Sequence, residues 1–120
     1  MTLASLRAFA LRLPQATVVR QWGGSWVFKV GGKLFLVVVA DGDIPVAATF
    51  KPRPQDRAAL SQREGLRLAP YLARAGWVQV DDMDSVASDE LRPWILASYQ
   101  AACLRVSKRE RTALGLHTGP

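Results

Sequence analysis

The chain has 120 residues, of which 49% are hydrophobic and 22% are charged, values typical of a single globular domain. Its one cysteine, Cys103, excludes an intrachain disulfide and favours a reducing compartment, so we expect a cytoplasmic protein. The net charge of +6 favours anionic partners such as nucleic acid, acidic protein surfaces or anionic lipid. The longest apolar run, residues 34–40, is too short to cross a bilayer, and arginines interrupt the apolar N-terminus, so we expect neither a membrane protein nor a signal peptide.

The N-terminal residues predict a helix that ends at Pro14. Thr2 can cap it, and the apolar residues of one helical face follow at spacings of three and four: Leu3, Leu6, Ala10 and Leu13.

Four strands are predicted next, over residues 16–22, 26–30, 33–40 and 46–51, because these runs are rich in β-branched and aromatic residues. Gly31 and Gly32 predict a two-residue hairpin turn between the second and third strands, since both turn positions need a positive φ. Such a turn would pair Val30 with Lys33, Phe28 with Phe35 and Trp26 with Val37.

The second half predicts a helix from Pro54 to about residue 63, an irregular or briefly helical segment over 66–76, a strand over 77–81 and a helix over 88–106. Ser88 can cap the last helix, which Pro93 is expected to kink or delay. We predict an α+β fold in the order α-β4-α-β-α, with two layers, an antiparallel sheet and helices packed on one face. The domain covers residues 1–114, and residues 115–120 form a flexible tail.

The turn at Gly31 and Gly32 does not match a phosphate-binding loop, although Lys33 follows it. That loop has a glycine where Val27 stands and a serine or threonine where Leu34 stands. We therefore interpret the glycines as turn residues.

The sequence contains few side chains that could act in catalysis or bind a metal ion. The only histidine, His117, lies in the tail, and Cys103 falls beside the apolar stripe of the last helix, so no nucleophile can be paired with a base. One cysteine and one histidine cannot build a zinc site, and the acidic run over 81–84 lacks the glycine and glutamate of a calcium loop. We expect a protein that is not an enzyme and holds no cofactor or metal.

Four tryptophans are many for this length, and aromatic rings beside basic residues can stack on bases. Trp26 shares a strand face with Phe28 and is expected in the core. Trp22 and Trp77 stand at strand ends, where the pattern leaves core and surface both open.

Basic residues gather at three places, and residues 81–90, which hold five acids and no base, separate the third place from the first two. A hairpin with lysines near its tip could grip backbone phosphates as a wing, without reading sequence. The predicted phosphate contacts are Lys29 and Lys33 beside the hairpin tip, Lys51, Arg53 and Arg57 after the fourth strand, and Lys108, Arg109 and Arg111 near the C-terminus.

Four stretches together resemble the MmcQ/YjbR family of small bacterial proteins: VFKVGGKLFLVV, ATFKPRPQDRAAL, APYLARAGWVQVD and DELRPWILASYQAACLRVSKRERTAL. The resemblance implies a CyaY-like fold, shared with bacterial frataxin homologues, and a "double wing" arrangement described as DNA-binding. It places Lys29, Lys33, Lys51, Tyr71 and Trp77 at positions that recur in the family. Iron binding of the frataxin kind is disfavoured, because residues 2–13 hold two arginines and no acid.

Two functions follow from these patterns. The first is non-enzymatic binding of nucleic acid, DNA above all, through the phosphate backbone and with little sequence preference. The alternative is a protein-interaction or small-ligand-binding module with a basic surface, its site in the loop of Tyr71, Arg74 and Trp77. The expected partners are nucleic acid in the first case and a protein or small molecule in the second, and we expect a monomer or a weak homodimer.

Overall fold

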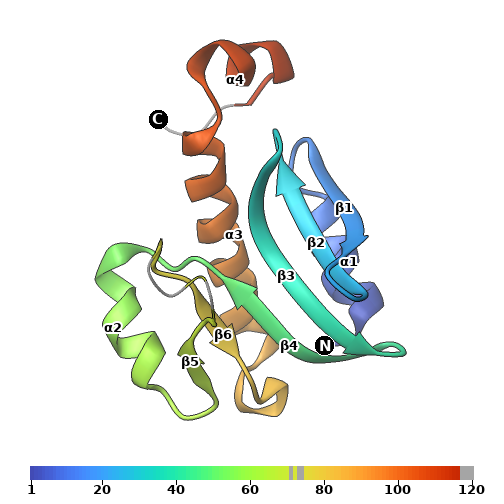
Figure 1. The fold of residues 1–120 in the computed structure, drawn as a ribbon, viewed down its shortest axis with the longest axis vertical. Coiled ribbons are helices and arrows are strands. Elements are labelled where there is room, and N and C mark those ends of the chain that lie inside the picture. The colour runs from blue at the N-terminus through green and yellow to red at the C-terminus, as the bar shows by residue number, and fades with distance from the viewer. Residues whose placement is uncertain (71, 73–74, 117–120) are drawn as a thin grey trace.

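A computed structural model of the chain describes all residues except 71, 73, 74 and 117–120. The elements are, in chain order, α1 (Leu3–Leu11), β1 (Ala16–Gln21), β2 (Ser25–Val30), β3 (Lys33–Asp41), β4 (Ile44–Phe50), α2 (Pro54–Gln62), β5 (Leu66–Leu68), β6 (Val78–Val80), the 3₁₀ turn η2 (Met83–Ser85), α3 (Ser88–Arg105) and α4 (Lys108–Leu114). The strands form one antiparallel sheet in the order β1-β2-β3-β4-β6-β5, so the predicted α+β class is confirmed (Figure 1).

Besides the short 3₁₀ turn η2, the structure adds one strand and one helix to the predicted order. The segment expected to be irregular contains β5, which pairs with β6, from Leu66 opposite Val80 to Leu68 opposite Val78. After α3 the chain turns at Ser107, whose hydroxyl accepts a hydrogen bond from the Glu110 N–H, and forms α4. Leu116, placed in the tail by the sequence pattern, is only 7% exposed and belongs to the main core.

The β2–β3 hairpin has the predicted turn but not the whole predicted register. Gly31 and Gly32 have φ angles of 54° and 77°, and Val30 lies opposite Lys33. A β-bulge then shifts the pairing, so Phe28 lies opposite Leu36 and Trp26 opposite Val38, and the two other predicted pairs are wrong. Because a bulge sets an extra residue against one partner, Phe35 and Leu36 both join the core.

Helices α1 and α3 pack on one face of the sheet and bury the main core. Its largest fully buried side chains are Leu6, Phe28, Phe35, Leu36, Leu91 and Ile95. A smaller core of Phe50, Leu66, Val78 and Val80 lies toward α2, where Phe50 stacks on Trp94 with ring centroids 5.4 Å apart. The described helices leave the opposite face of the sheet uncovered, and we call it the open face (Figure 1).

Ser98 of α3 is fully buried where β3 and β4 separate. The pairing of these strands begins at Val37 and Thr49. Beyond that pair, the Ser98 hydroxyl donates to the Phe35 carbonyl at 2.6 Å and accepts from the Lys51 N–H at 2.9 Å. A side chain thus satisfies two backbone groups that a longer ladder would otherwise have paired.

Arg63, at the end of α2, ties that helix to the start of α3. Its guanidinium donates to both carboxylate oxygens of Glu90, at 2.5 and 2.9 Å, and to the Ser85 carbonyl. The hydrogen bond from Arg63, with a second from the Ala87 N–H, lowers the pKa of Glu90 from 4.5 to about 2.

Candidate nucleic-acid interface

The tip of the β2–β3 hairpin packs against the junction of α3 and α4. A Cβ atom on Gly31 would lie 2.7 Å from a Val106 methyl carbon and 3.6 Å from one of Leu114. Only a residue without a side chain allows the backbone to come this close. The contact therefore joins the hairpin to the C-terminal helices, which lie far away in the sequence (Figure 1).

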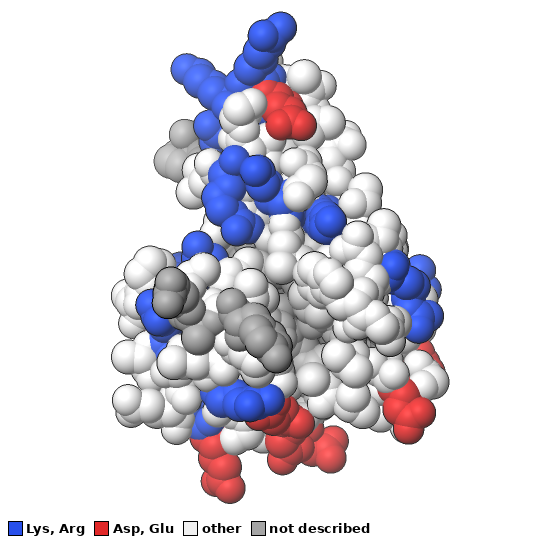
Figure 2. Space-filling view, viewed as in Figure 1, with Lys and Arg blue, Asp and Glu red and all other residues white. Residues whose placement is uncertain are grey.

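This packing gathers most of the predicted phosphate contacts at one end of the molecule, which we call the basic end: Lys29, Lys33, Lys108, Arg109 and Arg111. Lys33, Lys108 and Arg109 are exposed, and Lys29 and Arg111 are half-buried. Figure 2 shows basic side chains clustered over α4 and the end of α3.

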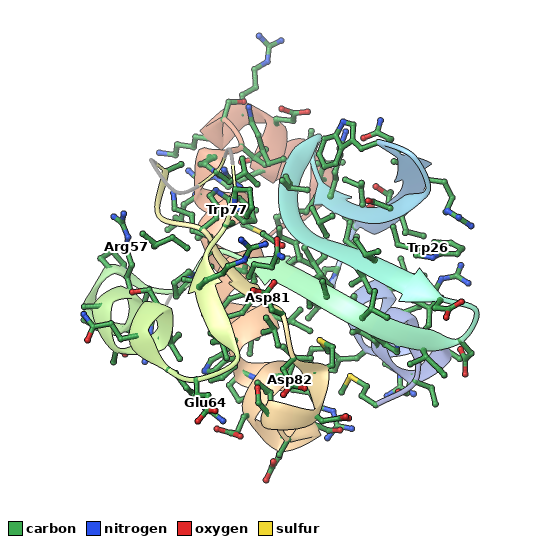
Figure 3. All side chains as sticks on the ribbon, turned by 60° about the horizontal axis from the view of Figure 1, so that its bottom comes forward. Trp26, Arg57, Glu64, Trp77, Asp81 and Asp82 are labelled. Atoms are coloured by element: carbon green, nitrogen blue, oxygen red, sulfur yellow. The ribbon has the colours of Figure 1, made fainter. Side chains whose placement is uncertain are left out.

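The remaining predicted contacts lie elsewhere. Arg53 precedes α2 and forms an ion pair with Asp56 at 3.0 Å. Arg57, on α2, lies over Gly76, and its Cδ atom is 3.6 Å from where a Cβ would stand (Figure 3). Lys51 follows β4 and lies closer to the basic end, since its backbone is held by Ser98 beside Phe35. The structure thus places Arg53 beside Asp56 and Arg57 beside Gly76.

Acidic side chains collect at the opposite end of the molecule (Figure 2). Glu64 and Asp82 lie near the start of α3, where Asp82 approaches Gly65 (Figure 3). The strand β3 begins at Lys33 beside the basic end and finishes at Asp41 in the acidic region. At about 3.3 Å per residue, its eight steps separate the two regions by about 26 Å.

Arg105, which the sequence analysis did not assign, joins the basic end to the open face. Its guanidinium donates to the Leu34 carbonyl at 2.5 Å and lies 5.8 Å from the ring centre of Trp77. Burial lowers the pKa of this arginine. In the sequence it is one more cation at the end of a long helix, and no local pattern marks its contact with β3.

The open face consists of cross-strand rows of side chains. The row nearest the hairpin tip contains Thr17, Lys29 and Leu34. The next row crosses all six strands and is mostly apolar on β1, β2 and β3: Val19, Val27, Val37, Thr49, Gln79 and Arg67. Arg67 closes this row in an ion pair with Asp81 at 2.6 Å.

A groove of about 470 Å³ runs along this face below the row of Lys29. Its floor includes Val37, Val39, Ala47 and Thr49, and its walls include Leu72 on one side and Trp22 on the other. Figure 2 looks onto this face and shows the surface hollowed below the basic cluster. A volume of this size is within the range of about 300 to 1,000 Å³ found for small-molecule sites.

Trp22 is the most unusual residue at the groove. Its side chain is 65% exposed, and its φ of 50° lies in the left-handed region that bulky residues rarely adopt. In the sequence Trp22 stands at the end of a predicted strand, a position that is compatible with both core and surface. No local signal predicts this backbone, because glycine and asparagine are the residues that usually adopt it.

The predicted interaction loop is only partly described. Tyr71 and Arg74 lie outside the described residues. Trp77 is 2% exposed, and its backbone bonds to Ala69 and Leu72 lie within the segment that connects β5 to β6. The ring of Trp77 is thus packed, while Leu72 of the same segment lines the groove. Trp26 is half-buried against the main core, as expected.

Cys103 is fully buried, and burial raises the pKa of its thiol. Within residues 1–70, 72 and 75–116, no three His, Cys, Asp or Glu side chains gather where they could hold a metal ion. Over this same part of the chain, no helix has the length and apolar character needed to cross a membrane.

Comparison with known proteins identifies the family and the fold. The model of the YjbR family matches residues 11–101. The chain is similar to the Deinococcus radiodurans protein DR2400, of the DUF419 domain, with a TM-score of 0.83 and 24% identity over 99% of this chain and 91% of that one. A Pseudomonas syringae protein is similar with a TM-score of 0.68 and 17% identity over 85% of this chain and 99% of that one. A search of the curated proteins found no match.

Proposed function

The chain belongs to the YjbR family, and on this premise we propose that it is a non-enzymatic protein of the cytoplasm that binds DNA through the phosphate backbone. The basic end makes the contacts. The observation that carries the proposal is the packing of Gly31 on Val106 and Leu114, which unites the hairpin lysines with the cations of α4.

The chemistry of these side chains supports backbone contacts rather than base reading. Lys33, Lys108 and Arg109 are exposed at one end of the molecule, and most of the acidic side chains lie at the opposite end (Figure 2). Lysine and arginine neutralise phosphates and release counterions, which yields affinity with little sequence information. We therefore propose binding that is strongly dependent on salt and weakly dependent on sequence.

Reversing two charges at the basic end tests this function. In the variant K108E/R109E we expect much weaker binding of duplex and single-stranded DNA, and a log–log salt slope smaller by about 2, because two phosphate contacts are lost. Fluorescence anisotropy across a salt series measures both quantities.

The matched control is R12E/R92E, which changes the net charge equally at two exposed arginines outside the basic end. Equal weakening by both variants would show that net charge alone attracts DNA. Absence of binding to any DNA by the wild-type protein at low salt would end the proposal.

The open-face groove favours a second candidate function, a small-ligand-binding or protein-interaction module. A ligand held by the apolar floor would bind with little salt dependence, because few ions are released. Binding of an apolar probe to the wild-type protein, together with no binding of DNA, would favour this function over the first.

A further inference from the structure

We propose that the open-face groove holds the bases of single-stranded DNA, stacked on Trp22, while the basic end contacts the phosphates. This inference rests on the proposed function and specifies its substrate as an unpaired DNA strand. The groove, the cations above it and the conformation of Trp22 carry it.

The groove and Lys29 of the basic end lie on the same face of the sheet, and Val37 of the groove stands in the row next to that of Lys29. Ser25 and Lys29 project from the same face of β2, and Ser25 lines the groove. The four steps along the strand from Ser25 to Lys29 span about 13 Å. Arg105 lies along the same edge, held by the Leu34 carbonyl, and Leu34 pairs with Lys29. A ligand in the groove therefore meets positive charge at one edge and apolar surface below it, as a strand of nucleotides requires.

Trp22 is placed to stack on a base. Trp22 forms one wall of the groove and is 65% exposed. Its left-handed backbone is strained, and such strain persists mainly where a side chain must be held in a particular place. An exposed aromatic ring on a face that also carries cations is the arrangement by which proteins bind single strands, since every base has a π face.

The lining favours an unpaired DNA strand over a duplex or RNA. In a duplex the base faces are stacked on one another and are not available to Trp22. The groove is lined mostly by apolar side chains such as Val37, Val39 and Ala47, against which a ribose 2′-hydroxyl would lose its hydrogen bonds to water. Gln79 accepts from Thr49 and donates to Asp81, and its remaining N–H can meet the polar edge of a base.

The experiment compares four oligonucleotides of one length, about 12 nucleotides: single-stranded DNA, the same strand with abasic sites, the duplex and the matching RNA. The proteins are the wild type, W22G, W22Y and I44A, the last removing an exposed apolar side chain outside the groove. W22G deletes the ring and suits the positive φ, so thermal melting should show an intact fold.

We expect the wild type to bind intact single-stranded DNA most tightly, and W22G to bind it about 5- to 150-fold more weakly, which is the loss of one stacked base. W22Y should restore most of the affinity, and I44A should leave it unchanged. The abasic strand should bind wild type and W22G equally.

Other results would overturn the inference and leave the proposed function in place. These are equal affinity for intact and abasic strands, no effect of W22G, or tighter binding of the duplex or the RNA. Failure of the wild type to bind any DNA at low salt is a separate outcome, and it overturns the proposed function as well.

Discussion

At the scale of one residue, Ser98 shows how the strands β3 and β4 are held apart where their pairing ends. Its hydroxyl stands between the Phe35 carbonyl and the Lys51 N–H, and the two strands diverge beyond it (Figure 1). Nothing in the local sequence marks this serine, because an ordinary helical pattern surrounds it. Its role depends on two strands more than 45 residues away in the chain.

Replacing this hydroxyl should destabilise the protein. In S98A the Phe35 carbonyl and the Lys51 N–H both lose their partner in a buried place, so we expect a loss of about 2 to 4 kcal/mol in the free energy of unfolding. Urea unfolding followed by circular dichroism measures it.

The control is S61A, since the Ser61 hydroxyl bonds only to the Ala58 carbonyl of its own helix among the bonds described, and its loss should change stability by less than about 0.5 kcal/mol. Equal stability of S98A and S61A would contradict the bridging role of Ser98.

At the scale of elements, the hairpin packs on the C-terminal helices through Gly31, the first of its two turn glycines. Both have a positive φ, so alanine strains either one. They differ in their surroundings: a Cβ on Gly31 would meet Val106 at 2.7 Å, whereas a Cβ on Gly32 would meet nothing within 4 Å.

G31A should therefore be less stable than G32A. We expect G32A to lose about 1 to 2 kcal/mol from backbone strain and G31A to lose a further 1 to 3 kcal/mol or so from overpacking. Chemical denaturation of the two variants gives the difference directly. If the two lose the same amount, the hairpin tip does not pack on α3 as described.

The same hairpin shows how much of the fold the sequence predicts. The turn was predictable, because two glycines between strand-like runs leave few alternatives. The bulge at Phe35 was not, since both Phe35 and Leu36 are apolar and either register buries one of them. The strand β5 is three residues long, and only its distant pairing with β6 defines it as a strand.

For the candidate site, composition and spacing indicated the basic residues but not their grouping. Lys29 and Lys108 were each predicted as phosphate contacts from the sequence, and their placement at one end of the molecule depends on the packing of Gly31. The groove was even harder to predict from the sequence. It is formed by side chains from several paired strands and by Trp22, whose backbone conformation local preferences disfavour.

At the scale of the whole molecule, acid stability should depend on the Arg63–Glu90 pair. The folded-state pKa of Glu90 is about 2 and its ordinary value is 4.5. The unfolded chain binds the proton more readily, so this carboxylate stabilises the fold fully above about pH 4.5 and less as the pH falls toward 2.

We expect E90Q to be less stable than the wild type at neutral pH and to approach it as the pH falls through that window. Urea midpoints measured at several pH values test this. D56N is the control, because it removes the exposed pair of Asp56 with Arg53 and should keep the wild-type acid profile. Parallel pH profiles for E90Q and the wild type would refute the expectation.

If the protein binds DNA as proposed, the separation of charge along β3 has a consequence for its approach to the nucleic acid. Cations at Lys33 and α4 and anions from Asp41 to the start of α3 give the molecule a dipole moment along its long axis. The field of a polyanion exerts a torque on such a body and rotates it before contact. The protein would meet DNA already oriented, and salt would slow its association rate more than the net charge of +6 alone implies.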